Sequence, residues 1–156
     1  RLMENPVHME TFKALGANPS PMPFGELFTA MQQKTMDGQE NPLLIIKTSK
    51  FYEVQKYLAL TGHFYSPAVL MVSDKMFKGL TADQQKALMD AAKEARDFER
   101  NFIIESEKKL VDELKAAKME VTTPDKALFQ KATESVYKKF EADIGKDLID
   151  QVRGTK

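Results

Sequence analysis

The chain has 156 residues, a length that fits one domain with a substantial core or parts of two. Lysine and arginine together number 23, as do aspartate and glutamate, so the formal net charge is zero. This balance removes the electrostatic argument for a nucleic-acid partner or for an anionic membrane surface. The absence of cysteine excludes disulfides and thiolate chemistry. No apolar run approaches the ~18 residues needed to cross a bilayer.

The N-terminal part predicts two helices joined by an extended connector. Residues 6–15 carry apolar side chains at helical spacing, and Gly16 follows as a helix stop. Residues 17–26 contain three prolines at alternating positions and are expected to be extended. A second helix is predicted from about Phe24 to Lys34, and its inward side chains would be Phe24, Leu27, Phe28 and Met31.

A polar turn, Asp-Gly-Gln-Glu-Asn-Pro at 37–42, stands directly before an apolar run. Asparagine caps exposed N–H groups and proline at the first helical position loses no hydrogen bond, so Asn41 and Pro42 predict a helix that begins at Pro42. A helix start beside Gln39, Glu40 and Asn41 would also favour an anion such as a carboxylate or a phosphate. A capped turn and an anion site are both open readings of the turn itself.

The middle of the chain predicts a strand followed by one long helix. Residues 51–73 are rich in aromatic and β-branched side chains, which predicts a strand bent near Gly62 and Pro67. Thr81 opens a capping-box pattern, and an apolar stripe then runs over 82–118 without glycine or proline. At ~1.5 Å per residue this helix would be about 55 Å long. The stripe lacks sustained heptads, which favours a strut between two lobes over a coiled-coil arm.

The remaining residues complete an α/β pattern. A short strand is predicted within 118–125, then a helix over 126–144 that stops at Gly145, and a final short helix over 146–154. Short strands that alternate with helices indicate the α/β fold class.

Few residues are suited to catalysis or metal binding. The two histidines, His8 and His63, lie far apart and lack a ligand pattern. Nucleotide-binding glycine loops and the serine elbow of hydrolases are absent from the sequence. We therefore expect no catalytic residue, no metal and no cofactor.

Aromatic residues near the polar turn indicate a pocket instead. Phe24, Phe51 and Tyr52 would form its walls, and Arg1 and Asn41 would supply hydrogen-bond donors. Each of these aromatic residues, taken alone, is more often a core residue.

Three stretches, "FKALGANPSPMPFGELFTAMQ", "MDGQENPL" and "SKFYEVQKYLALTGH", closely resemble the solute-binding proteins of tripartite ATP-independent periplasmic (TRAP) transporters, of the DctP type. The similarity covers the whole chain and is most specific from Ala14 to His63. It implies a two-lobed α/β binding protein that closes on its ligand, with a long helix spanning both lobes. Family members carry a large N-terminal portion ahead of this region, so the chain resembles their C-terminal half and lacks most of the N-terminal lobe.

The resemblance also implies a ligand site. The family's arginine, which holds a ligand carboxylate in two parallel hydrogen bonds, falls on Arg1, and a planar guanidinium suits that task. Asn41 and Phe24 match the family's polar and aromatic contacts. Glu40 is expected to orient its neighbours, because a carboxylate beside an anionic ligand would repel it. Asn5 would donate to a hydroxyl group or a second carboxylate.

These points predict a periplasmic receptor that binds a small organic acid, a dicarboxylate or sugar acid, and delivers it to the TRAP membrane permease. Residues 1–66 and 107–156 would form the ligand-binding lobe, and residues 67–106 would add a strand and the long helix to the other lobe. Without the N-terminal half, uncovered apolar surface would favour self-association. Two alternatives stay open: an enzyme of small organic-acid metabolism, and a sensor or scaffold domain outside transport.

Overall fold

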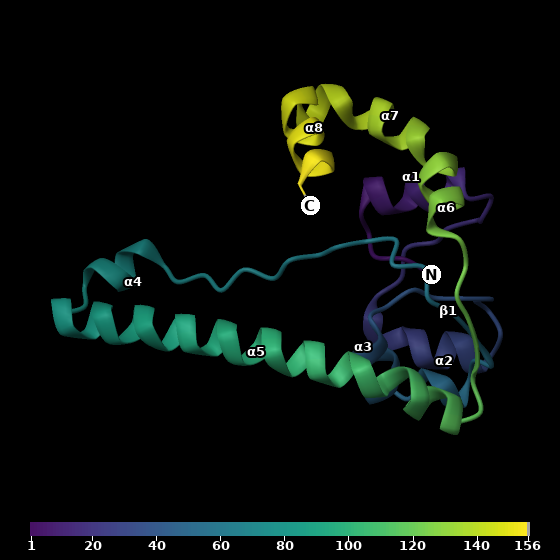
Figure 1. Cartoon of the computed structure of the whole chain (residues 1–156), viewed down its shortest axis with the longest axis horizontal. Helices are drawn as coiled ribbons and strands as arrows, with labels where there is room; N and C mark the ends of the chain where they lie inside the picture. The colour runs from purple at the N-terminus through teal and green to yellow at the C-terminus, as the bar shows by residue number, and fades with distance from the viewer. Residues whose placement is uncertain (156) are drawn as a thin grey trace.

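The computed structural model describes residues 1–155. Its helices are α1 (Pro6–Ala14), α2 (Leu27–Gln32), α3 (Leu43–Thr48), α4 (Asp74–Lys78), α5 (Ala82–Ala116), α6 (Lys126–Ala132), α7 (Glu134–Ile144) and α8 (Lys146–Gly154). Short 3₁₀ turns cover Phe24–Glu26 and Phe51–Glu53, and the strands are β1 (Tyr57–Ala59) and β2 (Glu120–Thr122). Figure 1 shows α5 running along one side and extending well beyond the body, while α6, α7 and α8 arch over α1 on the opposite side.

The core lies where α2, α3 and the C-terminal end of α5 meet. Its buried side chains come from two stretches of the chain, residues 27–51 and residues 114–119: Leu27, Met31, Ile46, Phe51, Leu114 and Met119. β1 and β2 extend the core as a parallel pair in which Leu58 stands opposite Val121. The core therefore fixes α3, and with it the polar turn that precedes α3, to the end of the long helix.

The long helix is confirmed as a single element, α5. The Thr81 hydroxyl accepts a hydrogen bond from the backbone N–H of Gln84, and the Gln84 side chain accepts one from the N–H of Thr81, so the capping box is formed. Two donors at the helix start are satisfied in this way. The helix ends shortly before Lys118, whose φ of 68° is left-handed. The apolar stripe and the capping box were thus sufficient signals for this element.

Large apolar side chains are uncovered on α5 and on the segment that leads into it. Phe98 is 72% exposed and Phe102 is 50% exposed, although both belong to the apolar stripe. In the segment between β1 and α4, Leu70 and Met71 are 77% and 83% exposed. Large apolar side chains exposed in such number are typical of a surface that another part of the protein or a partner covers. Residues 1–155 do not supply that contact.

The strand predicted over 51–73 is wrong for most of its length. Strand geometry is confined to β1, and residues 60–73 contain no strand. A strand persists when a neighbouring chain segment accepts and donates its backbone hydrogen bonds. Within residues 1–155 β2 is the partner of β1, and it is three residues long. The β-forming composition of 60–73 therefore has no hydrogen-bonding partner here.

The single helix predicted over 126–144 is also wrong, because it is broken into α6 and α7 at Thr133. The Thr133 hydroxyl donates to the carbonyl oxygen of Phe129 at 3.0 Å, and the backbone turns to φ −99° and ψ 4°. A threonine hydroxyl that bonds to its own helix competes with regular geometry in this way.

The second predicted helix, from Phe24, is confirmed in shortened form as a 3₁₀ turn followed by α2. Leu27 and Met31 are buried as expected, at 0% and 4% exposure. Phe24 was predicted to point inward and does not, since it is 47% exposed. The proline-containing connector holds Phe24 at the rim of the core rather than inside it.

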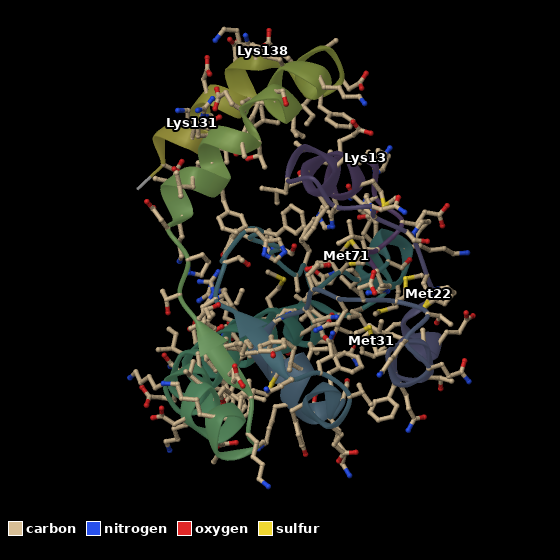
Figure 2. The ribbon with its side chains drawn as sticks, turned by 90° about the vertical axis from the view of Figure 1, so that its right-hand side faces the viewer. Lys13, Met22, Met31, Met71, Lys131 and Lys138 are labelled. Atoms are coloured by element: carbon tan, nitrogen blue, oxygen red, sulfur yellow. The ribbon has the colours of Figure 1, made fainter. Side chains whose placement is uncertain are left out.

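The helical arch is attached to the body through α1. α7 packs against α1, where Val136 and Thr11 are buried. Lys139 of α7 forms an ion pair with Glu10 of α1. Figure 2 shows Lys131 and Lys138 on the outer side of the arch, away from this contact.

Candidate functional site

Arg1 lies beside the connector that leads into α2. Leu2 forms an isolated parallel bridge with Pro21, and its N–H donates to the carbonyl oxygen of Ser20 at 3.0 Å. This pairing places Arg1 next to Met22, whose carbonyl oxygen accepts a hydrogen bond from Arg1 Nε at 2.8 Å. Within residues 1–155 the two Nη groups of Arg1 have no acceptor. The guanidinium is therefore fixed at Nε and has its terminal fork free.

Phe24 forms an aromatic wall beside this guanidinium. Cζ of Arg1 lies 5.9 Å from the centroid of the Phe24 ring. On its other side Phe24 meets the ring of Phe51 edge-on, with 5.9 Å between the centroids. Phe51 is 1% exposed, so it supports Phe24 from the core and does not itself line a surface pocket. Tyr52 likewise packs against the core, beside the ammonium group of Lys47.

The polar turn at 37–42 is tied to Arg1 through its backbone. The backbone nitrogen of Arg1 donates to the carbonyl oxygen of Gly38 at 2.8 Å. Asn41 does not cap α3: the helix begins after Pro42, whose ψ of 149° is extended, and no side chain accepts its first N–H groups. Nδ2 of Asn41 donates instead to Oε1 of Gln39 at 2.6 Å. The predicted cap at Asn41 is therefore wrong, because Pro42 stays extended and itself takes the cap position ahead of α3.

Glu40 is held by a histidine from a distant segment. Oε2 of Glu40 lies 3.3 Å from Nε2 of His63, and Nδ1 of His63 lies 2.6 Å from the Thr61 hydroxyl. These contacts fit an imidazole with its proton on Nε2, with Thr61 donating to Nδ1. The side chains of Glu40 and His63 are 16% and 18% exposed. Sequence reasoning missed His63, because no local pattern links two residues that are 23 positions apart.

His8 lies close to His63, since both imidazole rings pack against Phe64. Its ring stacks on Phe64 with 3.9 Å between the centroids and 15° between the planes. Nδ1 of His8 is buried and lacks a hydrogen-bond partner in the described chain. Burial lowers the pKa of His8, the Glu40 carboxylate opposes that shift, and the nearby His63 adds a smaller lowering effect. His8 therefore packs from α1 onto Phe64 in surroundings that favour the neutral form of its ring.

Asn5 has a structural task that the sequence analysis did not assign. Its Oδ1 accepts hydrogen bonds from the backbone N–H groups of Val7 at 2.9 Å and His8 at 3.1 Å, which caps α1. The sequence contains the signal for this cap, since an asparagine directly before a proline is a typical helix start. Among residues 1–155 no hydrogen bond links Asn5 to Arg1 or Asn41. The contacts therefore bring Arg1, Phe24 and the turn together, and Asn5 is not linked to them by a hydrogen bond.

The surface carries further grooves. One lies between α3 and α5 and includes Leu44, Lys47 and Phe102. Another lies beside α2 and includes Met22, the residue whose carbonyl oxygen accepts the hydrogen bond from Arg1 Nε. The described residues hold no group of three His, Asp or Glu side chains placed to bind a metal ion. None of the helices in residues 1–155 combines the length and the apolar character needed to cross a membrane.

Comparison with known proteins agrees with the resemblance found in the sequence. The family described as bacterial extracellular solute-binding protein, family 7, matches residues 1–143. The chain belongs to this family. A solute-binding protein from Verminephrobacter eiseniae is 44% identical, and the match covers 100% of this chain and 47% of that protein. The 2,3-diketo-L-gulonate-binding periplasmic protein YiaO of Escherichia coli K12 is 38% identical, over 97% of this chain and 48% of that protein.

Solved structures of the family have the same fold. A TRAP periplasmic solute-binding protein from Polaromonas sp. JS666, bound to D-erythronate, superposes with a TM-score of 0.92 at 41% identity. The superposition covers 100% of this chain and 52% of that one. The predicted TRAP binding-protein fold is confirmed. The chain spans about half the length of the relatives that it matches.

Proposed function

We propose that this chain is the C-terminal half of a periplasmic receptor that binds a small organic acid, a sugar acid or a dicarboxylate, through the guanidinium of Arg1. The observation that carries the proposal is the state of that side chain. Nε of Arg1 is bound to the Met22 carbonyl at 2.8 Å, and no acceptor in residues 1–155 occupies Nη1 or Nη2. A fixed guanidinium with a free fork is suited to two parallel hydrogen bonds with a carboxylate.

Three further residues are proposed to contact the ligand beside Arg1. Phe24 presents a half-exposed ring 5.9 Å from the guanidinium, and that ring would pack against the carbon skeleton of a bound acid. Asn41 belongs to the turn that the Arg1 backbone holds, so its remaining amide N–H would donate to the same ligand. Asn5 would donate through Nδ2 to a hydroxyl or second carboxylate, while its Oδ1 caps α1.

Glu40 is assigned an orienting role rather than a ligand contact. A free carboxylate near the bound acid would repel it and weaken binding. In this structure one oxygen of Glu40 is occupied by His63, at 3.3 Å from Nε2. In this arrangement Glu40 stiffens the turn that carries Asn41.

The relatives point to the chemistry of the ligand. The E. coli protein is named for binding 2,3-diketo-L-gulonate and the Polaromonas protein is bound to D-erythronate. Both ligands are carboxylates with sugar-like carbon chains. Each offers one anionic group for an arginine and several oxygens for amide donors. We infer an acid of the same class for this receptor, which would release it to a TRAP membrane permease.

The half-length match and the uncovered apolar surface support a division into lobes. Residues 1–66 and 107–156 would form the ligand-binding lobe, which contains Arg1 and the core around Leu114. Residues 67–106 would pack in the other lobe, which would bury Leu70 and Phe98. The whole receptor is this chain joined to the N-terminal half that completes the cleft.

Analysis of the bound ligand tests the proposal. The whole receptor is purified under native conditions and mildly denatured, and the released small molecules are identified by mass spectrometry. We expect one acid of the sugar-acid or dicarboxylate class in near one-to-one ratio, and the same acid should raise the melting temperature of ligand-free receptor. A receptor that carries no acid and is not stabilised by any acid of either class would refute the proposal.

A further inference from the structure

The turn at 37–42 is anchored at several points that do not involve Asn41. Gly38 accepts the hydrogen bond from the backbone of Arg1 at 2.8 Å. The Gln55 side chain donates to the carbonyl oxygen of Asp37 at 3.4 Å. Glu40 contacts His63 at 3.3 Å. The turn is therefore held at Asp37, Gly38 and Glu40, and what remains to be fixed is the orientation of the Asn41 amide.

A single side-chain contact fixes that amide in the described chain. Nδ2 of Asn41 donates to Oε1 of Gln39 at 2.6 Å, across two residues of the same turn. An asparagine amide has two N–H donors on one side and an oxygen on the other, and it presents opposite polarity when it rotates by half a turn. With one N–H held by Gln39, the second N–H keeps a defined direction. Without the Gln39 acceptor, the Asn41 amide can rotate so that its oxygen stands where the free N–H was, and that oxygen would repel a carboxylate.

We propose that Gln39 is a positioning residue that sets the polarity of the Asn41 amide and thereby selects an anionic ligand. The inference rests on the proposed function, since it assumes that Asn41 faces a bound acid. Gln39 does not touch the ligand in this account and acts through Asn41 alone.

The choice of glutamine has a physical reason. The position needs a hydrogen-bond acceptor on a side chain long enough to reach Asn41, and glutamate would also meet that need. A glutamate would, however, add a negative charge beside Asp37 and Glu40, at a site that receives an anion. Glutamine supplies the acceptor oxygen without the charge, whereas methionine has similar length and lacks a strong acceptor.

Calorimetric titration of the whole receptor with D-erythronate and with 2,3-diketo-L-gulonate tests the inference. Gln39→Met should weaken binding of the acid that binds better by roughly 10-fold, the usual size of a lost hydrogen bond. Asn41→Ala should weaken it by a similar or larger factor. The double variant should bind no more weakly than Asn41→Ala, because Gln39 acts only through Asn41. Gln33→Met, the same change at an exposed position after α2, should leave the affinity unchanged.

A nuclear magnetic resonance measurement reports on the amide itself. In ¹⁵N-labelled receptor the side-chain NH₂ signals of Asn41 are assigned by their loss in Asn41→Ala. We expect one of the two protons to be shifted downfield by the bond to Gln39, with the shift lost in Gln39→Met and retained in Gln39→Glu. Gln39→Glu should nevertheless bind the acid more weakly than wild type because of its added charge.

Two sets of results would overturn the inference. One is an unchanged affinity or an unchanged Asn41 signal in Gln39→Met; the other is a double variant whose loss equals the product of the two single losses. The proposed function is tested separately by the search for a bound acid, and it fails if the receptor carries no acid and no sugar acid or dicarboxylate stabilises it. In that case the NH₂ signal still decides whether Gln39 holds Asn41. A melting temperature equal to wild type confirms that Gln39→Met is folded.

Discussion

Replacing Phe98 by alanine in the whole receptor should be far more destabilising than its exposure in this chain suggests. Phe98 is 72% exposed here, and a phenylalanine side chain of ~200 Å² then leaves about 140 Å² of apolar surface uncovered. If the other lobe buries that surface, the burial contributes about 3.5 kcal/mol at ~25 cal/mol per Å². We therefore expect Phe98→Ala to lower the free energy of unfolding of the whole receptor by about 3 kcal/mol, in the range of buried phenylalanines.

Urea denaturation followed by circular dichroism measures this difference. Arg100→Ala is the matched control, since Arg100 lies on the opposite face of α5 and is exposed. Its loss should change the free energy of unfolding by less than ~0.5 kcal/mol. A Phe98→Ala receptor as stable as the Arg100→Ala receptor would refute the assignment of residues 67–106 to the other lobe.

Three further outcomes are expected. Leu114→Ala should cost about 3 kcal/mol of unfolding free energy in the same assay, because Leu114 is fully buried in the core, and a cost below ~1 kcal/mol would contradict that packing. The pKa of His8 is lowered by burial, so the contribution of neutral His8 to folding stability is present above about pH 6.5 and is lost as the pH falls. His8→Phe keeps the stack on Phe64, and thermal melts should show that it loses less stability than wild type between pH 7 and pH 5. Parallel curves of melting temperature against pH would contradict this. Residues 1–156 produced alone should self-associate through the surface around Phe98, as measured by size-exclusion chromatography with light scattering, and a stable monomer would contradict the account.

Sequence reasoning succeeded where a pattern was local and self-consistent. α5 could be predicted because its capping box, its apolar spacing and the absence of glycine and proline all agree over 35 residues. The end of α1 could be predicted because Gly16 takes a φ of 84°, which other residues avoid. In both cases the residues that set the conformation lie within a few positions of the element.

It failed where the deciding contact came from another segment. Residues 60–73 have the composition of a strand, but composition does not supply the neighbour whose backbone completes the hydrogen bonds. Asn41 has the local signal of a cap, yet its amide is engaged by Gln39 and Pro42 stays extended. The contact between Glu40 and His63 was invisible for the same reason, as it depends on how the chain returns past the turn.

Binding by Arg1 variants of the whole receptor is the most direct test of the central claim. The acid recovered from the receptor is titrated calorimetrically into wild type, Arg1→Ala and Arg1→Lys. A buried carboxylate left without its partner costs about 3 to 5 kcal/mol, so Arg1→Ala should weaken binding by more than ~100-fold. Arg1→Lys should also bind poorly, because an ammonium group cannot replace a guanidinium that is held at Nε by the Met22 carbonyl and binds a carboxylate through its two Nη groups. Near wild-type affinity in Arg1→Ala would contradict the claim that this chain binds its ligand through that guanidinium.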